Sequence, residues 1–473
     1  MAESAVVVKK RSNARGAKCW QIVIARREKP MFVHSIDENQ RKTKLDRISE
    51  RAVKQKESVF NNLGHIIDLQ MLRDCYQQLE GRKAVGIDGV TKEIYGRKLE
   101  DNLQDLLSRI RRCAYKPQPS KLVEIPKEDG SVRPLAIACF EDKLVQKSVA
   151  TILTKVFEPL FLPCSYGYRE GFNGHQALQD LMKYSNQSYN GATVEIDLQK
   201  YFNSIPHLEL MKILREKICD KRFLELIGKL IRSPVMEGDK VTINKRGCPQ
   251  GSIISPILAN IYLHYVIDDW FNKIKISHLK GKAEMVRFAD DMVFVFQDSN
   301  DAKRFYDVLP KRLGKFGLDL NTKKSNIIPS GRKAALEASK REERIPTYKF
   351  LGFICYWGKS RKGFWRLKFK SRSDRLRAKL KGLRKYLKEN RACETQEMLK
   401  RVIRVVKGWI NYHAISDNHR RVKAFIAHSE RMLFNWINRK GGKRRMNWKR
   451  FGELLKKIKY PQNFKTTSMF VSL

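Results

Sequence analysis

The sequence contains no continuous run of roughly 18 apolar residues, the length that a membrane-crossing helix requires. It also lacks a secretory signal, because its first apolar stretch is very short and lies on the wrong side of the neighbouring basic residues. We therefore expect a protein with no membrane partner and a cytoplasmic location. The alternative is an organelle, because the first residues are rich in Lys and Arg and poor in acidic residues.

Paired cysteines are also missing. The nine cysteines are odd in number and scattered, and no C-x-x-C motif occurs. This pattern favours a reducing compartment and excludes a disulfide framework or a zinc finger. The nine histidines are equally dispersed, so we assign them to the core, to helix caps or to the surface rather than to a metal site.

Acidic residues are scarce relative to basic ones. Lys and Arg number 96 against 50 Asp and Glu, which gives a formal net charge of +46. Such an excess indicates a polyanionic partner, most often nucleic acid, with a basic membrane-surface protein as the competing class. Residues 371–473 hold 28 basic and 7 acidic residues, so nearly half of the net charge lies there, and we expect helices with one cationic face.

The chain of 473 residues, 42% of them hydrophobic, is long enough for more than one domain. Alternating and periodic segments predict a mixture of strands and helices, with hairpins over 121–137, 285–296 and 347–369. From residue 372 onward the pattern is helical throughout, whereas residues 1–40 indicate a basic arm or a short strand pair. We predict an α+β catalytic body with a helical appendage.

The stretch "RFADDMVFVF" places two adjacent carboxylates, Asp290 and Asp291, inside an apolar run that favours strands. Burying an unpaired charge is costly, so the pair needs a surface turn, a cation or a metal. A plain hairpin turn is the simplest interpretation. A second pair, Asp268-Asp269, follows apolar residues at helical spacing, and we predict that it lies on a solvated helix face.

Asp197 supplies a partner for the first pair, because it ends the strand-like segment "ATVEIDL". A carboxylate at a strand end that faces a hairpin tip would form an acidic cluster, and such a cluster needs a cation. Mg²⁺ prefers carboxylate oxygens, and two ions about 3.5–4 Å apart stabilise an in-line phosphoryl displacement. With a nucleic-acid partner, the reaction would be nucleotidyl transfer.

Eight segments then occur in one order: "GIDGVT", "IPKEDGSVRPLAIACFEDKLVQ", "FEPLFLPCSYGYREGFNGHQAL", "EIDLQKYFNSIPH", "GCPQGSIISPILANIYL", "RFADDMVFVF", "GLDLNTKKSNIIPSG" and "KFLGFICY". In this order they resemble the polymerase blocks of bacterial group II intron reverse transcriptases, also called intron-encoded maturases. "VVKGWINYH" and "LFNWINRKGGKRRMNWKRFGELLKKIKYPQ" resemble the thumb (maturase) region and the short DNA-binding tail of that family. The resemblance extends from about residue 41 to about residue 465.

The resemblance implies a right-hand polymerase, with fingers and a palm built on an antiparallel sheet, followed by an all-helical thumb and a short basic helical tail. We expect a basic N-terminal extension over 1–40 and fingers and palm over 41–365, including a helical extension over 41–120. The thumb (maturase) domain would cover 366–429 and the DNA-binding tail 430–473.

The implied function is RNA-directed DNA synthesis, in which intron RNA is copied into cDNA at a target DNA 3′ end, together with a maturase role in splicing. The implied partners are group II intron RNA, target DNA and dNTPs in a bacterial cytoplasm, and a homodimer is compatible with this. One alternative is a domesticated reverse transcriptase that serves phage defence or repair. The other is an RNA-binding splicing factor without polymerase activity, against which the intact carboxylates argue.

By the same resemblance, Asp197 and Asp290 bridge two Mg²⁺ ions, for which Mn²⁺ is an alternative. Asp291 completes the acidic cluster, and the backbone of Leu198 faces a metal. Taken alone, Asp197 would also suit a helix N-cap, although Ser204 and Asn203 are better placed for that role.

The remaining roles concern the nucleotide. Phe202, five residues after Asp197, would exclude a 2′-OH, although any single Phe is by default a core residue. Lys127 and Arg133 flank the turn of the fingers hairpin and would bind the triphosphate, with a solvated hairpin tip as the alternative. Gln250 would contact the nascent base pair or the incoming nucleotide, and Lys324 would support the carboxylates or the primer phosphate.

In the tail, we predict that five basic residues contact nucleic-acid phosphates without reading sequence. We expect the nearby tryptophans to be core anchors of small helices. The basic residues are Lys443, Arg444, Arg445, Lys449 and Arg450, and the tryptophans are Trp409, Trp436 and Trp448.

Two positions depart from the family pattern. Phe288 stands where a Tyr is commonest, and Ser252 replaces a glycine of similar size. Many members of the family end in a nuclease domain that contains His and Cys, whereas here no cysteine follows Cys393. We expect no cleavage of the target strand by this chain, so a pre-existing DNA 3′ end would be required.

Overall fold

The protein is described by a computed structural model that covers residues 6–12, 18–24, 35–126, 132–243, 245–440 and 445–470, with side chains from residue 44 onward except that of residue 440. The helices are α1 (Ser35–Lys54), α2 (Leu69–Gln78), α3 (Lys92–Gly96), α4 (Leu99–Arg111), α5 (Phe140–Phe157), α6 (Gly174–Gln187), α7 (Tyr201–Ser204), α8 (His207–Lys217), α9 (Lys221–Ile231), α10 (Ser255–Leu263), α11 (Asp269–Ser277), α12 (Ser299–Lys315), α13 (Arg332–Lys340), α14 (Ser373–Glu389), α15 (Thr395–His413), α16 (His419–Lys440) and α17 (Trp448–Lys457).

The strands form four sheets. A hairpin of β1 (Val6–Ser12) and β2 (Lys18–Ile24) stands alone, and the others have the orders β4-β3-β6-β7, β10-β5-β9-β8 and β11-β12-β13. Their strands are β3 (Ser120–Pro126), β4 (Val132–Ile137), β5 (Gly191–Ile196), β6 (Pro234–Glu237), β7 (Lys240–Ile243), β8 (Ala283–Phe288), β9 (Asp291–Phe296), β10 (Asn326–Ser330), β11 (Tyr348–Phe350), β12 (Phe353–Lys359) and β13 (Trp365–Ser371).

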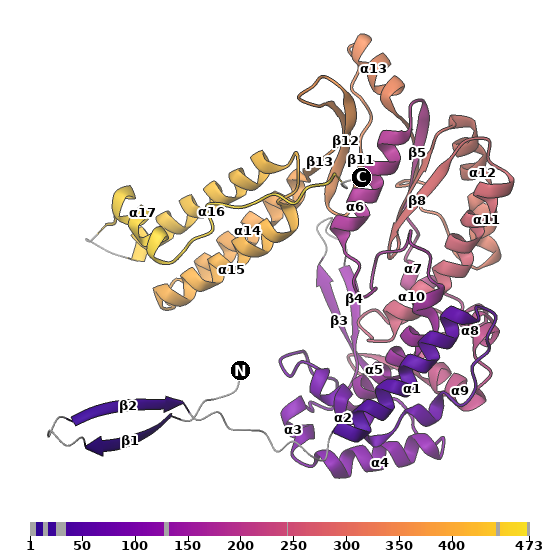
Figure 1. The fold of residues 1–473 in the computed structure, drawn as a ribbon, viewed down its shortest axis with the longest axis vertical. Helices are drawn as coiled ribbons and strands as arrows, with labels where there is room; N and C mark the ends of the chain where they lie inside the picture. The colour runs from indigo at the N-terminus through magenta and orange to yellow at the C-terminus, as the bar shows by residue number, and fades with distance from the viewer. Residues whose placement is uncertain are drawn as a thin grey trace.

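The sheet β10-β5-β9-β8 is antiparallel throughout and is covered on both faces. Helices α11 and α12 lie on one side and α6 on the other (Figure 1). Alternate residues of β9 therefore enter different cores: Phe294 packs with Phe305 of α12, whereas Val293 lies in the cluster that includes Leu181 of α6. This burial on two faces explains why the strand sequences are almost continuously apolar.

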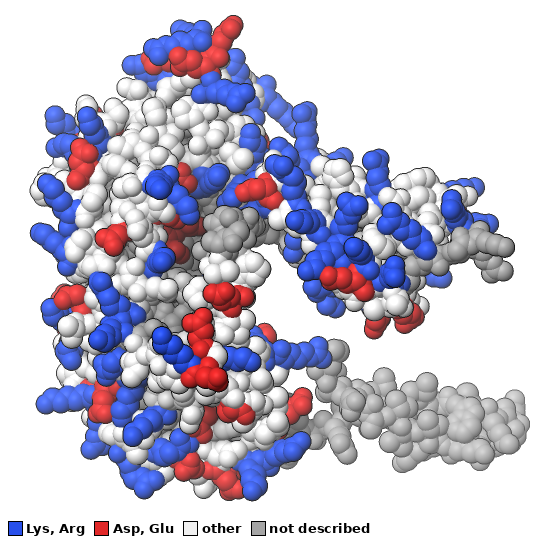
Figure 2. All heavy atoms as spheres, turned by 180° about the vertical axis from the view of Figure 1, so that it is seen from behind, with Lys and Arg blue, Asp and Glu red and all other residues white. Residues whose placement is uncertain are grey.

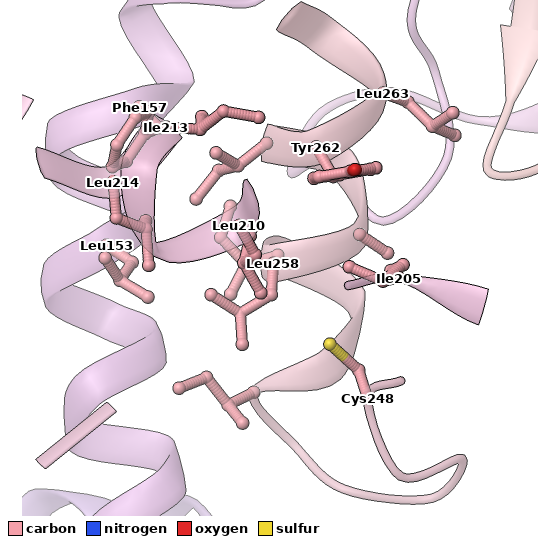
Figure 3. Packing of buried hydrophobic residues seen from close by; sticks show 14 of the residues in the cluster. Leu153, Phe157, Ile205, Leu210, Ile213, Leu214, Cys248, Leu258, Tyr262 and Leu263 are labelled. Atoms are coloured by element: carbon pink, nitrogen blue, oxygen red, sulfur yellow. The ribbon is translucent and has the colours of Figure 1, made fainter. Parts of the chain in front are cut away.

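The largest core lies beneath this sheet, where α5, α8 and α10 meet. Figure 3 shows Leu153 and Phe157 of α5 facing Leu214 of α8, with Leu258 of α10 beside them. Leu153, Phe157, Leu214 and Leu258 are completely buried. Since each buried Leu or Phe side chain contributes about 1.5–3 kcal/mol, this cluster anchors the helices that support the sheet.

Helices α14 to α17 form an arm that extends from the β11-β12-β13 sheet, and the β3-β4 hairpin stands across from it (Figure 1). The arm has its own core, which includes Leu383, Val402, Val406 and Phe425. Figure 2 shows the molecule hollowed between the arm and the lower body, with Lys and Arg spread over the arm.

The three predicted hairpins are present, although the turn of the first, residues 127–131, lies outside the described residues. The strand pair in the basic N-terminal segment is also present. The expectation that everything after residue 372 is helical is wrong for residues 458–470, which form no helix or long strand.

The prediction for Asp268 is also wrong. The side chain is completely buried, because residues His264–Asp268 form a π-helical turn between α10 and α11. Such a turn holds one more residue than an α-helical turn and rotates everything that follows by about 100°. Asp268 is thereby turned inward, and only Asp269 faces solvent, where it pairs with Lys273 at 2.7 Å.

Candidate active site

Asp197, Asp290 and Asp291 lie at one edge of the β10-β5-β9-β8 sheet. Strand β5 ends at Ile196, which pairs with Met292 of β9. Because the strands are antiparallel, Asp197 after Ile196 lies across from Asp291 before Met292. Strands β8 and β9 are joined by the two residues Ala289 and Asp290, and Ala289 has a left-handed backbone with φ of 57°. The structure thus brings together the three carboxylates that the sequence suggested.

The three carboxylates influence one another. Burial raises the pKa of Asp290, and the charge of Asp197 raises it further. Burial also raises the pKa of Asp291 to about 6, with further contributions from Asp290 and Asp197, whereas Arg375 opposes the shift. Burial and the neighbouring carboxylates therefore both disfavour the charged form of Asp290 and Asp291.

The turn before β10 positions Asp197. The Asn321 side-chain amide donates to Asp197 Oδ2 at 2.7 Å, and Lys324 Nζ lies 4.0 Å from the same oxygen. The Asp197 backbone N–H donates to Ser325 Oγ at 3.0 Å. Lys324 therefore lies beside the Asp197 carboxylate. Asn321 and Ser325 were not predicted as site residues, although both lie close to Lys324 in the segment "NTKKSN".

Leu198, whose backbone was predicted to face a metal, is 6% exposed and forms an isolated bridge with Leu320. Its side chain belongs to the core that includes Ile196. The predicted role of its backbone remains a prediction.

The donor chemistry of the three carboxylates fits a hard divalent cation, because all of them offer oxygen and their charges raise the pKa of Asp290 and Asp291 despite the nearby Lys and Arg. Over the part of the chain that the structure describes, no three His, Cys, Asp or Glu side chains converge closely enough to hold an ion as they stand. An ion would therefore have to draw the carboxylates together.

The fingers hairpin lies within electrostatic reach of this cluster. Arg133 is exposed on β4, and its charge lowers the pKa of Asp290 and opposes the raised pKa of Tyr168. Tyr168, whose side chain is 57% exposed, was not predicted from the sequence as a site residue. Lys127 lies outside the described residues.

Phe202 is bonded through its backbone to the loop that contains Gln250. Phe202 on α7 is half-buried and contacts Tyr201 edge-on, with ring centroids 5.4 Å apart. Its carbonyl accepts the N–H of Cys248 at 2.7 Å, and the Gln250 carbonyl accepts the N–H of Ala136 at 2.6 Å. The loop of residues 247–252 therefore connects α7 to strand β4 of the fingers.

The basic tail residues Arg445, Lys449 and Arg450 are exposed, whereas Lys443 and Arg444 lie outside the described residues. Of the tryptophans, Trp409 is 6% exposed and is a core anchor, but Trp448 is 55% exposed. Trp448 stacks on Phe434 with ring centroids 3.9 Å apart, so its expected role as a buried anchor is wrong. Trp448 begins α17 and Phe434 lies on α16, so the stacked rings join the two helices while one face of the Trp448 ring stays accessible to solvent.

Two grooves on the arm are rich in cations. One, of about 480 Å³, lies between α14 and α16, and its lining includes Lys381, Arg384, Arg431 and Arg439 but no carboxylate. The other, of about 440 Å³, lies between α14 and α15 and is lined by Lys379, Arg401, Arg404, Val405, Gly408, Trp409, Tyr412 and His413.

Among the described residues, no helix is both long and apolar enough to cross a membrane.

Two family models match the chain. Residues 125–355 match "Reverse transcriptase (RNA-dependent DNA polymerase)", and residues 374–452 match "Group II intron, maturase-specific domain". The first match contains the three aspartates together with Phe202, and the second contains α14 to α16 with both grooves.

Three curated proteins are similar in sequence to part of this chain. The group II intron-encoded protein LtrA of Lactococcus lactis is 31% identical over 246 residues, which is 51% of this chain and 40% of the relative. Protein YkfC of Escherichia coli is 32% identical over 44% of this chain and 55% of the relative. An uncharacterized 91 kDa protein in the cob intron of Schizosaccharomyces pombe is 32% identical over 49% of this chain and 29% of the relative. The matches thus cover between 29% and 55% of these relatives.

Proposed function

We propose that this chain, a homologue of group II intron-encoded proteins that contains their reverse transcriptase and maturase-specific domains, copies group II intron RNA into DNA and promotes splicing of that RNA. The observation that supports the polymerase activity best is the strand register. Ile196 pairs with Met292, so Asp197 at the end of β5 lies across from Asp291, whose neighbour in the turn is Asp290. All three lie inside the matched domain. The resemblance found in the sequence is confirmed. The RNA substrate, the target DNA and the splicing role are proposals.

In the polymerase reaction, the primer 3′-hydroxyl attacks the α-phosphorus of a dNTP and pyrophosphate leaves. Two Mg²⁺ ions, or Mn²⁺, would stabilise the attacking and leaving oxygens. Asp197 and Asp290 would hold the ions, with Asp291 and the Leu198 carbonyl beside them. Asn321 and Lys324 orient Asp197 from the side of β10.

The nucleotide would lie between the carboxylates and the fingers. Arg133, which already acts electrostatically on Asp290, is placed to bind the triphosphate with Lys127. Phe202 would contact the sugar, and the loop containing Gln250 would contact the new base pair. The backbone link between Phe202 and Cys248 supports this pairing, because it fixes the two contact surfaces relative to each other.

The arm would bind RNA through its two grooves. Phosphate contacts from Lys and Arg supply most of the affinity for nucleic acid, and aromatic side chains add base stacking. The α14–α16 groove offers four such cations, with Trp436 in the same lining. Arg445, Lys449 and Arg450 extend the cationic surface toward α17.

The decisive experiment extends a DNA primer on an RNA template with Mg²⁺. The wild-type protein should synthesise cDNA, and Asp290→Asn should lower the rate by about 10³-fold or more, because a metal-bound charge contributes several kcal/mol. RNA binding by Asp290→Asn should be unchanged in a filter-binding assay.

The matched control is Asp269→Asn, which removes an exposed carboxylate paired with Lys273 on α11. It should extend primers at the wild-type rate. Full activity of Asp290→Asn would refute the site assignment. An inactive wild-type protein that still binds RNA would instead favour the splicing-factor alternative.

A further inference from the structure

The fully buried Arg287 lies on β8, three residues before Asp290. Nε and Nη2 donate to the two carboxylate oxygens of Asp268 at 2.8 and 2.6 Å, so the pair is bidentate. Nη1 donates to Asn260 Oδ1 at 2.9 Å, and Nη2 donates to Ser165 Oγ at 2.7 Å. A buried guanidinium is tolerated because its donors are satisfied in this way.

One further bond reaches the catalytic turn. Arg287 Nη1 donates to the carbonyl oxygen of Ala289 at 3.1 Å. That carbonyl belongs to the peptide that joins Ala289 to Asp290, and Ala289 has the left-handed φ of 57° that L-residues rarely adopt. The guanidinium therefore fixes the orientation of the peptide from which the Asp290 side chain projects.

The segment around Gly167 also packs directly against the turn. A Cβ atom on Gly167 would stand 2.4 Å from the backbone nitrogen of Ala289, so the two backbones touch. The carbonyl of Gly167 accepts a hydrogen bond from the Asn260 side chain at 2.7 Å. Asn260 thus binds both Arg287 and the segment that presses on the turn.

The π-helical turn is what allows Asn260 and Asp268 to serve one guanidinium. Eight residues of regular α-helix would leave them about 80° apart around the axis, because each residue turns about 100°. One extra residue in the turn reduces the difference to about 20°. Both side chains therefore point to the same side of α10 and its extension, toward β8.

We propose that Arg287, with Asp268 and Asn260, is a positioning network that sets the Asp290 carboxylate for nucleotidyl transfer. The proposal rests on the polymerase function given above. Stability alone does not require an ion pair here, because apolar side chains of similar volume replace buried pairs at equal or better stability in other proteins. An apolar replacement would lose the bond to Ala289, together with those to Asn260 and Ser165.

The test is the double variant Arg287→Met with Asp268→Leu, which removes both charges together and keeps the site packed. Its unfolding midpoint should fall only modestly, because the two buried charges are removed together and only the hydrogen bonds to the neutral partners are lost. The kcat of primer extension should fall by about 10²-fold, as expected for a reacting group displaced by about 1 Å. The KM for dNTP and the affinity for RNA should change by less than about twofold.

A second readout does not depend on activity. Mn²⁺ binding, followed by electron paramagnetic resonance, should weaken in the double variant, because Asp290 no longer points into the acidic cluster. An inactive wild-type protein that binds Mn²⁺ would remove the polymerase proposal, whereas the comparison of Mn²⁺ affinities would still decide the role of Arg287.

Arg287→Lys is the companion variant, since it keeps the charge beside Asp268 but cannot reach Asn260, Ser165 and Ala289 together. It should show the same losses to a smaller extent, which keeps the test valid if the double variant fails to fold. Arg109→Lys is the control, because the ion pairs of Arg109 are with Asp105 on α4 and Glu141 on α5 and involve no residue of the turn. A folded Arg287 variant with wild-type kcat and Mn²⁺ affinity overturns the proposal.

Discussion

Phe202 is the residue whose size we propose to decide the choice between deoxyribose and ribose. It lies on α7, five positions after Asp197, half-buried against the core and edge-on to Tyr201. Its backbone carbonyl also holds Cys248 in the neighbouring loop. The position is therefore rigid, which a steric filter for the sugar requires.

We predict that Phe202→Ala admits ribonucleotides. Removal of the ring leaves room for a 2′-OH, so the preference for dNTP over rNTP should fall by about tenfold or more. The measurement is kcat/KM for dCTP and for CTP opposite a template G. A folded variant with the wild-type preference would show that Phe202 is an ordinary core aromatic.

Several residues of the candidate site could be predicted from the sequence, and others could not. Asp290 and Asp291 stood out because charges interrupt an apolar strand, and Asp197 because it ends one. Arg287 left no such signal, since one polar residue before a turn is normal in a strand. Asn321 reaches Asp197 only because β10 pairs with β5, a contact between residues more than a hundred positions apart.

The loop of residues 247–252 shows how an element can join two parts of the site. Gly247 and Gly251 have φ of 88° and 102°, which favour glycine. A Cβ atom on Gly251 would stand 2.8 Å from the carbonyl oxygen of Ala136 on β4. The close approach permits the bond from Ala136 N–H to the Gln250 carbonyl.

We predict that Gly251→Ala displaces the loop from β4 and raises the KM for dNTP by about tenfold, since one hydrogen bond contributes about 1 kcal/mol and some strain is added. Steady-state primer extension measures this. Gly238→Ala is the matched control, because Gly238 has φ of 58° in the β6–β7 turn but open space around its Cβ position. Equal effects in both variants would mean that backbone strain alone is responsible.

The elements themselves were largely predictable, and their irregularities were not. Alternation of apolar residues predicted the β8–β9 hairpin, and helical spacing predicted α10 and α11. The π-helical turn between them has no sequence signature, because one extra residue per turn changes the phase without changing the composition. The parallel pairing of β3 with β6 was also missed, since it joins Ser120 to Val235 across the intervening palm segments.

Over the whole molecule, charge is the property that bears most on partners. The formal net charge is +46, and the α14–α16 groove contributes cations without a carboxylate. Binding of RNA should therefore release counterions and weaken steeply as salt rises. This expectation followed from composition alone, whereas the location of the groove required the packing of α14 against α16.

We predict that the slope of log affinity for RNA against log salt concentration is strongly negative. In the variant Arg384→Ala with Arg431→Ala the slope should become shallower by about 1–2 units, because each phosphate contact contributes about 0.7–0.9. Lys385→Ala serves as the control, since Lys385 lies on the same helix and pairs with Glu389. A flat salt response of the wild type, or equal slopes in all three proteins, would contradict the assignment.

Helix α14 begins next to the acidic cluster, and the charges of Arg372 and Arg375 at its start lower the pKa of Asp291. The base of the arm therefore brings positive charge to the acidic cluster. Loss of either guanidinium would leave Asp291 facing its two neighbouring carboxylates with less compensation.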